Sequence, residues 1–207
     1  MGCRQELGRL PPCRTGMITV VDTPSAAVAE VISRIRQGQR VKFLFFWGHR
    51  PERDGRVGRG CLSQWWPAPF TVDGREFATA EHYMMWRKAM LFGDRDSAEE
   101  ILRAPHPHRA KELGRGVRGF DQRRWEECRY GIVLAGCLAK FGQHADLRRF
   151  LLGTGDRVLV EASPVDPIWG IGLAADDPRV EDPRQWQGLN LLGFALAEAR
   201  GVLSAST

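Results

Sequence analysis

The chain has 207 residues, 43% of them hydrophobic and 27% charged, which is the composition of a globular protein long enough to bury one sizeable core and excludes a disordered chain. Its formal net charge of +5 comes from dispersed arginines, which favour an anionic ligand but form neither a basic stripe nor a known nucleic-acid-binding motif. No run of 18 apolar residues occurs, and the first twenty residues lack the apolar stretch of a secretory signal, so a cytoplasmic protein without a membrane partner is expected.

The beginning of the chain carries arginines and a Pro-Pro pair without apolar periodicity. Residues 1–16 are therefore expected to form a disordered basic tail, and residues 17–207 to form a single domain. In this domain, Pro24 follows a capping threonine and opens a predicted helix that ends near Gly38.

The next elements are strands. The apolar and aromatic run at 41–47 is short and rich in phenylalanine, which predicts a buried strand, and a Gly/Arg loop follows at 49–60. Asp73-Gly74 lies between residues 70–72 and 75–77. This pair predicts a tight hairpin, because both turn positions must tolerate positive φ.

Helices dominate the middle of the chain. The predicted helices span residues 80–92 after Thr79, 97–104 after Asp96, 107–114 from Pro107, and 121–141 from Asp121. The last of these is the longest, and its expected buried face consists of Trp125, Cys128, Ile132, Ala135 and Ala139.

The last third of the chain predicts a strand at 157–162, a long loop at 163–187 and a final helix at 189–203. A loop of about 25 residues is uncommon in a compact domain and usually carries function. Together these elements predict a mainly helical α+β domain with one small sheet or hairpin.

A carboxylate stands at the start of the helix at 80–92. Glu81 and His82 lie in its first turn, where unpaired backbone N–H groups favour a charged carboxylate, although Glu81 could equally decorate a helix end. Lys88 follows seven residues after Glu81, on nearly the same face, so a carboxylate and a cation could line one groove.

Seven tryptophans are a high number for this length, and four of them stand within two residues of a Gly or Pro rather than inside apolar runs. These four are Trp65, Trp66, Trp169 and Trp186. Tryptophan faces near charged groups can stack on a nucleobase, whereas core packing is the alternative for each of them. For Trp125, which heads the face of the long helix, both interpretations stay open.

The loop segment SPVDPIWGIG, residues 163–172, supplies Asp166 as a second carboxylate, and its Gly170 permits close backbone approach to a ligand. Because glycoside hydrolysis commonly uses two carboxylates, Glu81 and Asp166 could share one reaction. Asn190 precedes the final helix and either offers its amide to a ligand or caps that helix.

Seven segments, in this order, resemble the YbiA-like family, also called NADAR, from about residue 41 to residue 200. They are FLFFWG, CLSQWWPAPF, ATAEHYMMWRKAMLFGD, RRWEE, LAKFGQHADLRRFLLGTGD, DPIWGIG and GLNLLGFAL. The resemblance implies a mostly helical fold and an N-glycosidase. The implied substrates are phosphoribosylated intermediates of the early riboflavin pathway or ADP-ribosylated guanine.

By position, the resemblance implies functional roles for Glu81, Trp125, Asp166, Trp169 and Asn190. The chain departs from the family at two places. Ser63-Gln64 and Trp86-Arg87 stand where many members have Ser-Asn and Ala-Gln, so substrate choice can differ from theirs.

The sequence therefore predicts a hydrolase that cleaves the N-glycosidic bond between a ribose phosphate and a base. Glu81 is assigned to charge stabilisation or water activation, and Asp166 to water positioning or sugar binding. Substrate contacts are assigned to Trp125, Trp169, Lys88, Arg87, Asn190 and Gly170, with both cations as candidates for the phosphate.

No cofactor and no metal are expected, because the sequence contains no metal-ligand cluster. The expected partner is a small phosphorylated N-riboside. One alternative is an ADP-ribosyl hydrolase that acts on guanine in DNA. The other is a non-catalytic module that binds ADP-ribose or a nucleotide with the same aromatic and cationic residues.

Overall fold

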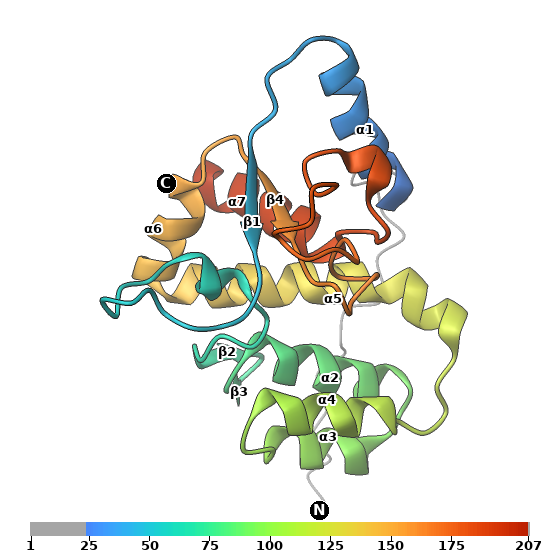
Figure 1. The fold of residues 1–207 in the computed structure, drawn as a ribbon. Helices are drawn as coiled ribbons and strands as arrows, with labels where there is room; N and C mark the ends of the chain where they lie inside the picture. The colour runs from blue at the N-terminus through green and yellow to red at the C-terminus, as the bar shows by residue number, and fades with distance from the viewer. Residues whose placement is uncertain (1–23, 207) are drawn as a thin grey trace, which may run out of the picture.

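The computed structural model describes residues 24–206, so the predicted tail at 1–16 lies outside the described part of the chain. The helix α5 crosses the middle of the molecule (Figure 1), with α2, α3 and α4 on one side and β1, β4, α6 and α7 on the other. The elements are α1 (Pro24–Arg36), β1 (Phe43–Phe46), η1 (Arg59–Leu62), β2 (Phe70–Val72), β3 (Arg75–Phe77), α2 (Ala80–Leu91), α3 (Arg95–Leu102), α4 (Pro107–Arg115), α5 (Gln122–Gln143), α6 (Ala145–Gly153), β4 (Val158–Glu161), η2 (Pro183–Gln185) and α7 (Leu191–Ala205). The predicted helix-dominated α+β fold is confirmed.

Most predicted elements are present. Asp73 and Gly74 both have positive φ, of 50° and 74°, in the β2–β3 hairpin. Thr79 caps α2 by accepting a hydrogen bond from the backbone N–H of His82. The helix α6 was not predicted from the sequence. Among the described residues, no helix is long and apolar enough to cross a membrane.

Two helix boundaries were predicted wrongly. Asp94, rather than Asp96, caps α3, because the Asp94 carboxylate accepts a hydrogen bond from the backbone N–H of Ser97 and is held by Arg118 at 2.6 Å. Gly114 does not end α4, which continues to Arg115; a Cβ at Gly114 would lie 2.1 Å from the Met85 sulfur, so the glycine permits close packing against α2.

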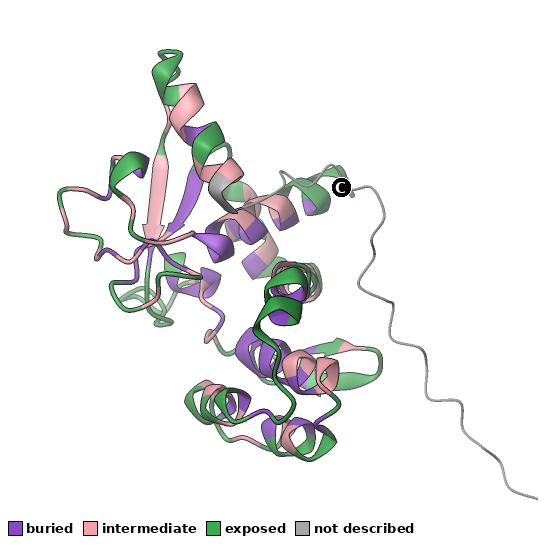
Figure 2. Cartoon of the chain, turned by 90° about the vertical axis from the view of Figure 1, so that its right-hand side faces the viewer, coloured by how far each residue is buried: buried purple, intermediate pink, exposed green. Residues whose placement is uncertain are grey.

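The buried face of α5 also differs from the prediction. Trp125, Cys128 and Ile132 are buried as expected, but Ala135 is exposed. Gly136 and Lys140 take the buried positions instead. A Cβ at Gly136 would come within 2.9 Å of the Tyr83 ring, so this glycine allows α2 to lie directly against α5. Figure 2 shows the buried residues of the helices in purple.

The strands β1 and β4 form a two-stranded parallel sheet, with Phe43 paired to Val158 and Phe46 to Glu161. The prediction that β1 is buried was wrong for three of its four residues, which are only partly buried, because α7 packs on β4 rather than on β1. Both strands end at the same edge of the sheet, and α2 begins near that edge. Ligands of parallel sheets commonly bind at the carboxyl ends of the strands.

Candidate functional site

Glu81 is enclosed at the start of α2, where its side chain is only 2% exposed and its Oε1 atom is buried without a hydrogen-bond partner. The backbone N–H of Glu81 donates to the Gln64 carbonyl at 3.0 Å, so the first turn is fastened to the preceding loop. Burial raises the pKa of the Glu81 carboxyl to about 7, against the opposing effects of the Lys111 charge and a hydrogen bond from Trp65.

A second buried carboxyl, Glu161, lies at the carboxyl end of β4. Its Oε2 atom is buried and unpartnered, and burial, reinforced by the negative charge of Asp166, raises its pKa to about 8. In the described part of the chain, Glu81 and Glu161 supply the only buried side-chain nitrogen or oxygen atoms without a partner. Since buried polar groups are nearly always satisfied, two such oxygens at one place indicate a ligand site.

The two glutamates are electrostatically coupled. Asp166 raises the pKa of each, Lys111 lowers the pKa of each, and Glu81 itself raises that of Glu161. Lys111 and Asp166 form an ion pair with a nitrogen–oxygen distance of 3.9 Å. Four segments that are far apart in the sequence therefore converge here: the start of α2, the middle of α4, the end of β4 and the loop after it.

Asp166 stabilises the turn of its own loop, because its Oδ1 accepts hydrogen bonds from the backbone N–H groups of Ile168 and Trp169 at 3.0 and 2.9 Å. Gly170 follows in the same turn. A Cβ at this position would lie 2.7 Å from the Glu161 carbonyl oxygen, so the glycine lets the loop fold onto the end of β4. Trp169 is partly buried against the core of the domain.

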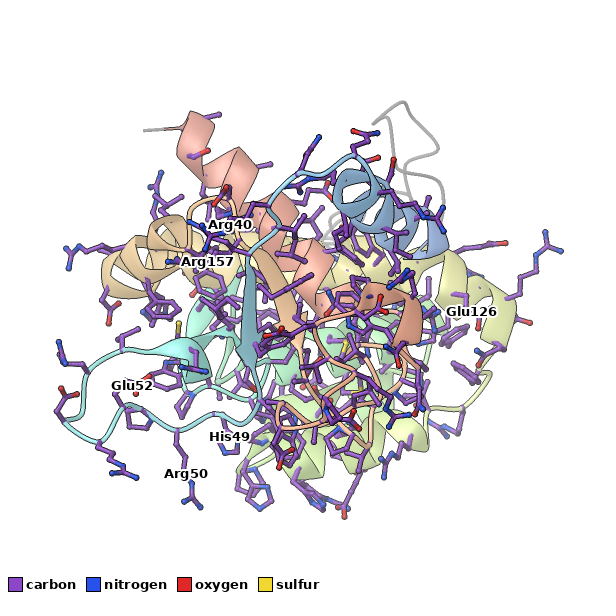
Figure 3. All side chains as sticks on the ribbon, turned by 45° about the horizontal axis from the view of Figure 1, so that its top comes forward. Arg40, His49, Arg50, Glu52, Glu126 and Arg157 are labelled. Atoms are coloured by element: carbon purple, nitrogen blue, oxygen red, sulfur yellow. The ribbon has the colours of Figure 1, made fainter. Side chains whose placement is uncertain are left out.

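Trp65 forms an aromatic wall beside the carboxyls. Its ring centroid lies 5.9 Å from Lys111 Nζ, 6.2 Å from the His108 ring and 5.7 Å from the His49 ring. His49 in turn borders a hollow of about 430 Å³ that residues 47–52 and 59–60 line. Figure 3 shows His49 and Arg50 at the end of β1 away from Arg40 and Arg157, with Arg50 pointing outward.

Trp47 is the most exposed aromatic residue of this hollow, with 60% of its surface accessible. Trp47 follows directly after β1, and Glu161 is the last residue of the paired parallel strand β4. The hollow and the carboxyls therefore lie at the same edge of the sheet. The sequence analysis assigned roles to neither Trp47, Lys111 nor Glu161. The available signal for Glu161 was a lone acidic residue at the end of an otherwise apolar strand, directly before the long loop.

The predicted phosphate ligands lie further along α2. Lys88 Nζ donates to the Gly114 carbonyl at 2.8 Å and lies 5.6 Å from the centroid of the Trp125 ring. Trp125 is 9% exposed. At about 1.5 Å per residue, Lys88 is about 10 Å from Glu81 along the helix axis. Arg87 Nη1 donates to the Tyr83 hydroxyl at 3.3 Å. Lys88 therefore lies beside Trp125 and Arg87 beside Tyr83, outside the carboxyl site.

Three other residues singled out in the sequence have structural contacts. Both His82 ring nitrogens are occupied, by the Thr79 hydroxyl at 2.8 Å and the Ala104 carbonyl at 3.2 Å. Trp86 packs on Phe77 of the hairpin. The Asn190 amide is fully buried and bonds the backbone of β4 on both sides. In the described residues, no group of three or more His, Cys, Asp or Glu side chains is placed to hold a metal ion.

The comparisons with known proteins agree with this fold. The sequence model of the NADAR domain matches residues 45–204. The chain is 41% identical over 164 residues to N-glycosidase R617 of Acanthamoeba polyphaga mimivirus, covering 77% of this chain and 95% of that protein. It is 34% identical over 145 residues to N-glycosidase YbiA of Escherichia coli, covering 70% of this chain and 82% of YbiA.

The NMR structure of E. coli YbiA superimposes with a TM-score of 0.65 at 30% identity, covering 81% of this chain and 88% of YbiA. The fold thus places the chain in the YbiA-like class. The protein belongs to the NADAR domain family. The predicted enzyme class, a hydrolase of N-glycosidic bonds, agrees with the names of these relatives.

Proposed function

We propose that this protein hydrolyses the N-glycosidic bond of a small phosphorylated N-riboside, with Glu81 and Glu161 as its catalytic pair. The observation that carries the proposal is the pair of buried, unpartnered carboxyl oxygens at the edge of the sheet. The N-glycosidase names of the relatives support the reaction class. Phosphoribosylated intermediates of riboflavin synthesis, the substrates implied by the sequence resemblance, are the first compounds to test.

The two carboxyls suit the two tasks of the reaction. Because burial raises the pKa of Glu161 to about 8 and that of Glu81 to about 7, Glu161 keeps its proton near neutral pH while Glu81 is partly ionised. Glu161, which has the higher pKa, is assigned as the acid that protonates the leaving nitrogen as the bond from C1′ to nitrogen breaks. Glu81 as the carboxylate stabilises the positive sugar and accepts the proton of the water that attacks C1′.

The surrounding groups fit the rest of such a substrate. Trp65 offers a ring face for the leaving base beside Lys111. Lys111 and Arg115 stand one turn apart on α4, and the positive charges of both act on Glu81, so they are assigned to the substrate phosphate. Asp166 is assigned to holding Lys111 and the loop turn, in addition to the sugar contact expected from the sequence.

The experiment is an incubation of purified protein with phosphoribosylated aminopyrimidines, free nucleotides and an oligonucleotide carrying ADP-ribosylated guanine. Released base and sugar are measured by mass spectrometry. Release from the first group, lost in both Glu81→Gln and Glu161→Gln, supports the proposal. Binding without release by the wild type, unchanged in Glu81→Gln, would instead support a non-catalytic nucleotide-binding module.

One observation favours a second candidate, the removal of ADP-ribose from guanine in DNA. The hollow beside Trp65 presents the exposed Trp47 together with Arg50 and Arg59. An exposed tryptophan stacks on a base and arginines bind phosphates, so this surface could hold nucleotides beyond the scissile bond. The same two carboxyls would act on this larger substrate.

A further inference from the structure

Lys140 is a charged residue inside the domain, outside the catalytic pair. It lies in the last turns of α5, is 1% exposed, and donates from Nζ to the carbonyl oxygens of Cys61 at 2.7 Å and Ser63 at 2.8 Å. Burial lowers its pKa to about 8, so the side chain remains mainly an ammonium at neutral pH. A buried ammonium persists only where hydrogen bonds compensate for its lost hydration.

The two carbonyls that Lys140 binds belong to the segment 61–66, which comprises the end of η1 and the turn after it. In this segment the Ser63 hydroxyl accepts a hydrogen bond from the backbone N–H of Trp65 at 3.1 Å. The Ser63 carbonyl, already bound to Lys140, also accepts from the backbone N–H of Trp66 at 3.3 Å. Lys140 therefore fixes the turn from which the Trp65 side chain projects.

The same segment reaches the catalytic carboxyl directly. The Gln64 carbonyl accepts the backbone N–H of Glu81 at 3.0 Å, and the Gln64 amide nitrogen lies 3.6 Å from the sulfur of Cys137, one turn before Lys140 on α5. The Trp65 side chain lies close enough to the Glu81 carboxyl to lower its pKa. Hydrogen bonds thus join α5 to the backbone of Glu81 through the segment 61–66, and Trp65 extends this path to the Glu81 side chain.

We propose that Lys140 is a positioning residue of the active site, which holds the segment 61–66 so that Trp65 stays against the Glu81 carboxyl. The kinetic part of this inference rests on the proposed function, whereas its structural part does not. A long aliphatic side chain would fill the same space. The carbonyls of Cys61 and Ser63, however, need a donor that reaches both of them, and lysine supplies three N–H groups at one point.

The first test measures backbone amide exchange without any substrate. In the wild type, amides of the segment 61–66 should exchange slowly, at rates closer to those of α5 than to those of the exposed loop at 49–56. In Lys140→Met, which keeps the side-chain length but removes the donors, the exchange of these amides should accelerate at least about 10-fold. Lys140→Arg, which keeps a charged donor, should restore much of the protection.

The matched control is Leu147→Ala, which truncates a residue of α6 that is 2% exposed and lies outside this hydrogen-bond path. It lowers the stability of the domain without removing a donor from the segment. If the segment 61–66 is unprotected in the wild type, or is loosened equally by Lys140→Met and Leu147→Ala, the inference is wrong. If Lys140→Met does not fold, amide exchange in the wild type and in Lys140→Arg still tests whether the segment 61–66 is held as inferred.

The second test is a double-mutant cycle in kcat, at a temperature where each variant is folded. Lys140→Met and Trp65→Phe should each lower kcat about 10-fold or more, with smaller changes in KM, and their combination should be little worse than either one alone. Fully additive losses would show that Lys140 does not act through Trp65. If no substrate is turned over by the wild type, the proposed function fails, while the amide-exchange result still stands or falls alone.

Discussion

The backbone N–H of Glu161 donates to the side-chain oxygen of Asn190 at 3.0 Å, and the amide nitrogen of Asn190 donates to the Leu159 carbonyl at 2.9 Å. Asn190 thereby ties the start of α7 to the end of β4, and its own φ of 52° lies in the left-handed region. The backbone of Glu161, the proposed acid, is thus held by the side chain of the residue that precedes the final helix. Asparagine suits this place because it tolerates that backbone conformation better than most residues.

Asn190→Ala should destabilise the domain by about 2–4 kcal/mol, because it removes two buried hydrogen bonds and leaves a non-glycine residue at positive φ. The loss of activity should appear in kcat. Urea denaturation and steady-state kinetics measure the two effects. A rise in KM with unchanged stability would show instead that the amide contacts the substrate, as the sequence also allowed.

Glu81→Gln and Glu161→Gln should each lower kcat by at least about 10²-fold, since each removes a proton-transfer or charge-stabilising group from the pair. Circular dichroism should show folded protein in both. Asp166→Asn, which leaves both glutamates in place, should cost less. Near-normal turnover by either glutamine variant would remove that residue from the catalytic assignment.

The stability of the wild type should fall as pH rises from about 5 to 8. The pKa values of Glu81 and Glu161 are raised to about 7 and about 8 in the folded protein, so in this window the folded state keeps protons that the unfolded state has lost. One pKa unit corresponds to about 1.4 kcal/mol. Either glutamine variant should therefore gain on the order of 2–3 kcal/mol relative to the wild type at pH 8 and little at pH 4.

Chemical denaturation of the three proteins at both pH values tests this directly. The comparison isolates the two carboxyls, because all other titrating groups are shared. Equal wild-type and variant stabilities at pH 8 would mean that the carboxyls are hydrated or paired in solution.

Trp125 is expected to act mainly as a core residue, because it is 9% exposed and packs in the main hydrophobic cluster. Trp125→Ala should cost about 3–5 kcal/mol of stability. Trp125→Phe should keep the fold and distinguishes the two interpretations. If it mainly raises KM, the ring also stacks on the substrate, as the family resemblance implies; unchanged kinetics would restrict it to the core.

Salt dependence separates the two substrate classes. A small phosphorylated riboside needs one or two cations, so its KM should change less than about tenfold between about 50 and 200 mM salt, in contrast to roughly 10³-fold or more for a protein with six phosphate contacts. Measuring kcat/KM on a phosphoribosylated aminopyrimidine and on ADP-ribosylated DNA over this range tests the preference. Faster and steeply salt-dependent release from DNA would reverse it.

Arg50→Ala sharpens that comparison, because Arg50 lines the hollow beside Trp47, whereas Arg53 stands in the same loop and does not line it. On a small riboside, both alanine variants should behave as the wild type. On a DNA substrate, Arg50→Ala should raise KM by several-fold and Arg53→Ala should not. Equal effects of the two variants would indicate general electrostatic attraction of the DNA rather than a defined nucleotide subsite in the hollow.

The sequence by itself determined the local structure wherever short-range chemistry decides it. The Asp73-Gly74 turn, the Thr79 cap and the α2 helix were predictable, and with them the place of Glu81 in a first helical turn. The family was also readable from motif order, since those segments lie where the NADAR domain model matches. The local structures depend on neighbours within a few residues, and the family assignment depends on the sequence motifs themselves.

Only the tertiary structure decided which residues share the site. Trp65, Glu81, Lys111 and Glu161 come from segments up to about one hundred residues apart, and no spacing rule relates them. The periodicity of α5 predicted a buried face but placed its later part at Ala135 and Ala139, whereas packing against Tyr83 and the segment 61–66 buries Gly136 and Lys140. Burial raises the pKa of both glutamates and lowers that of Lys140, and burial follows from the whole fold rather than from any one stretch of the chain.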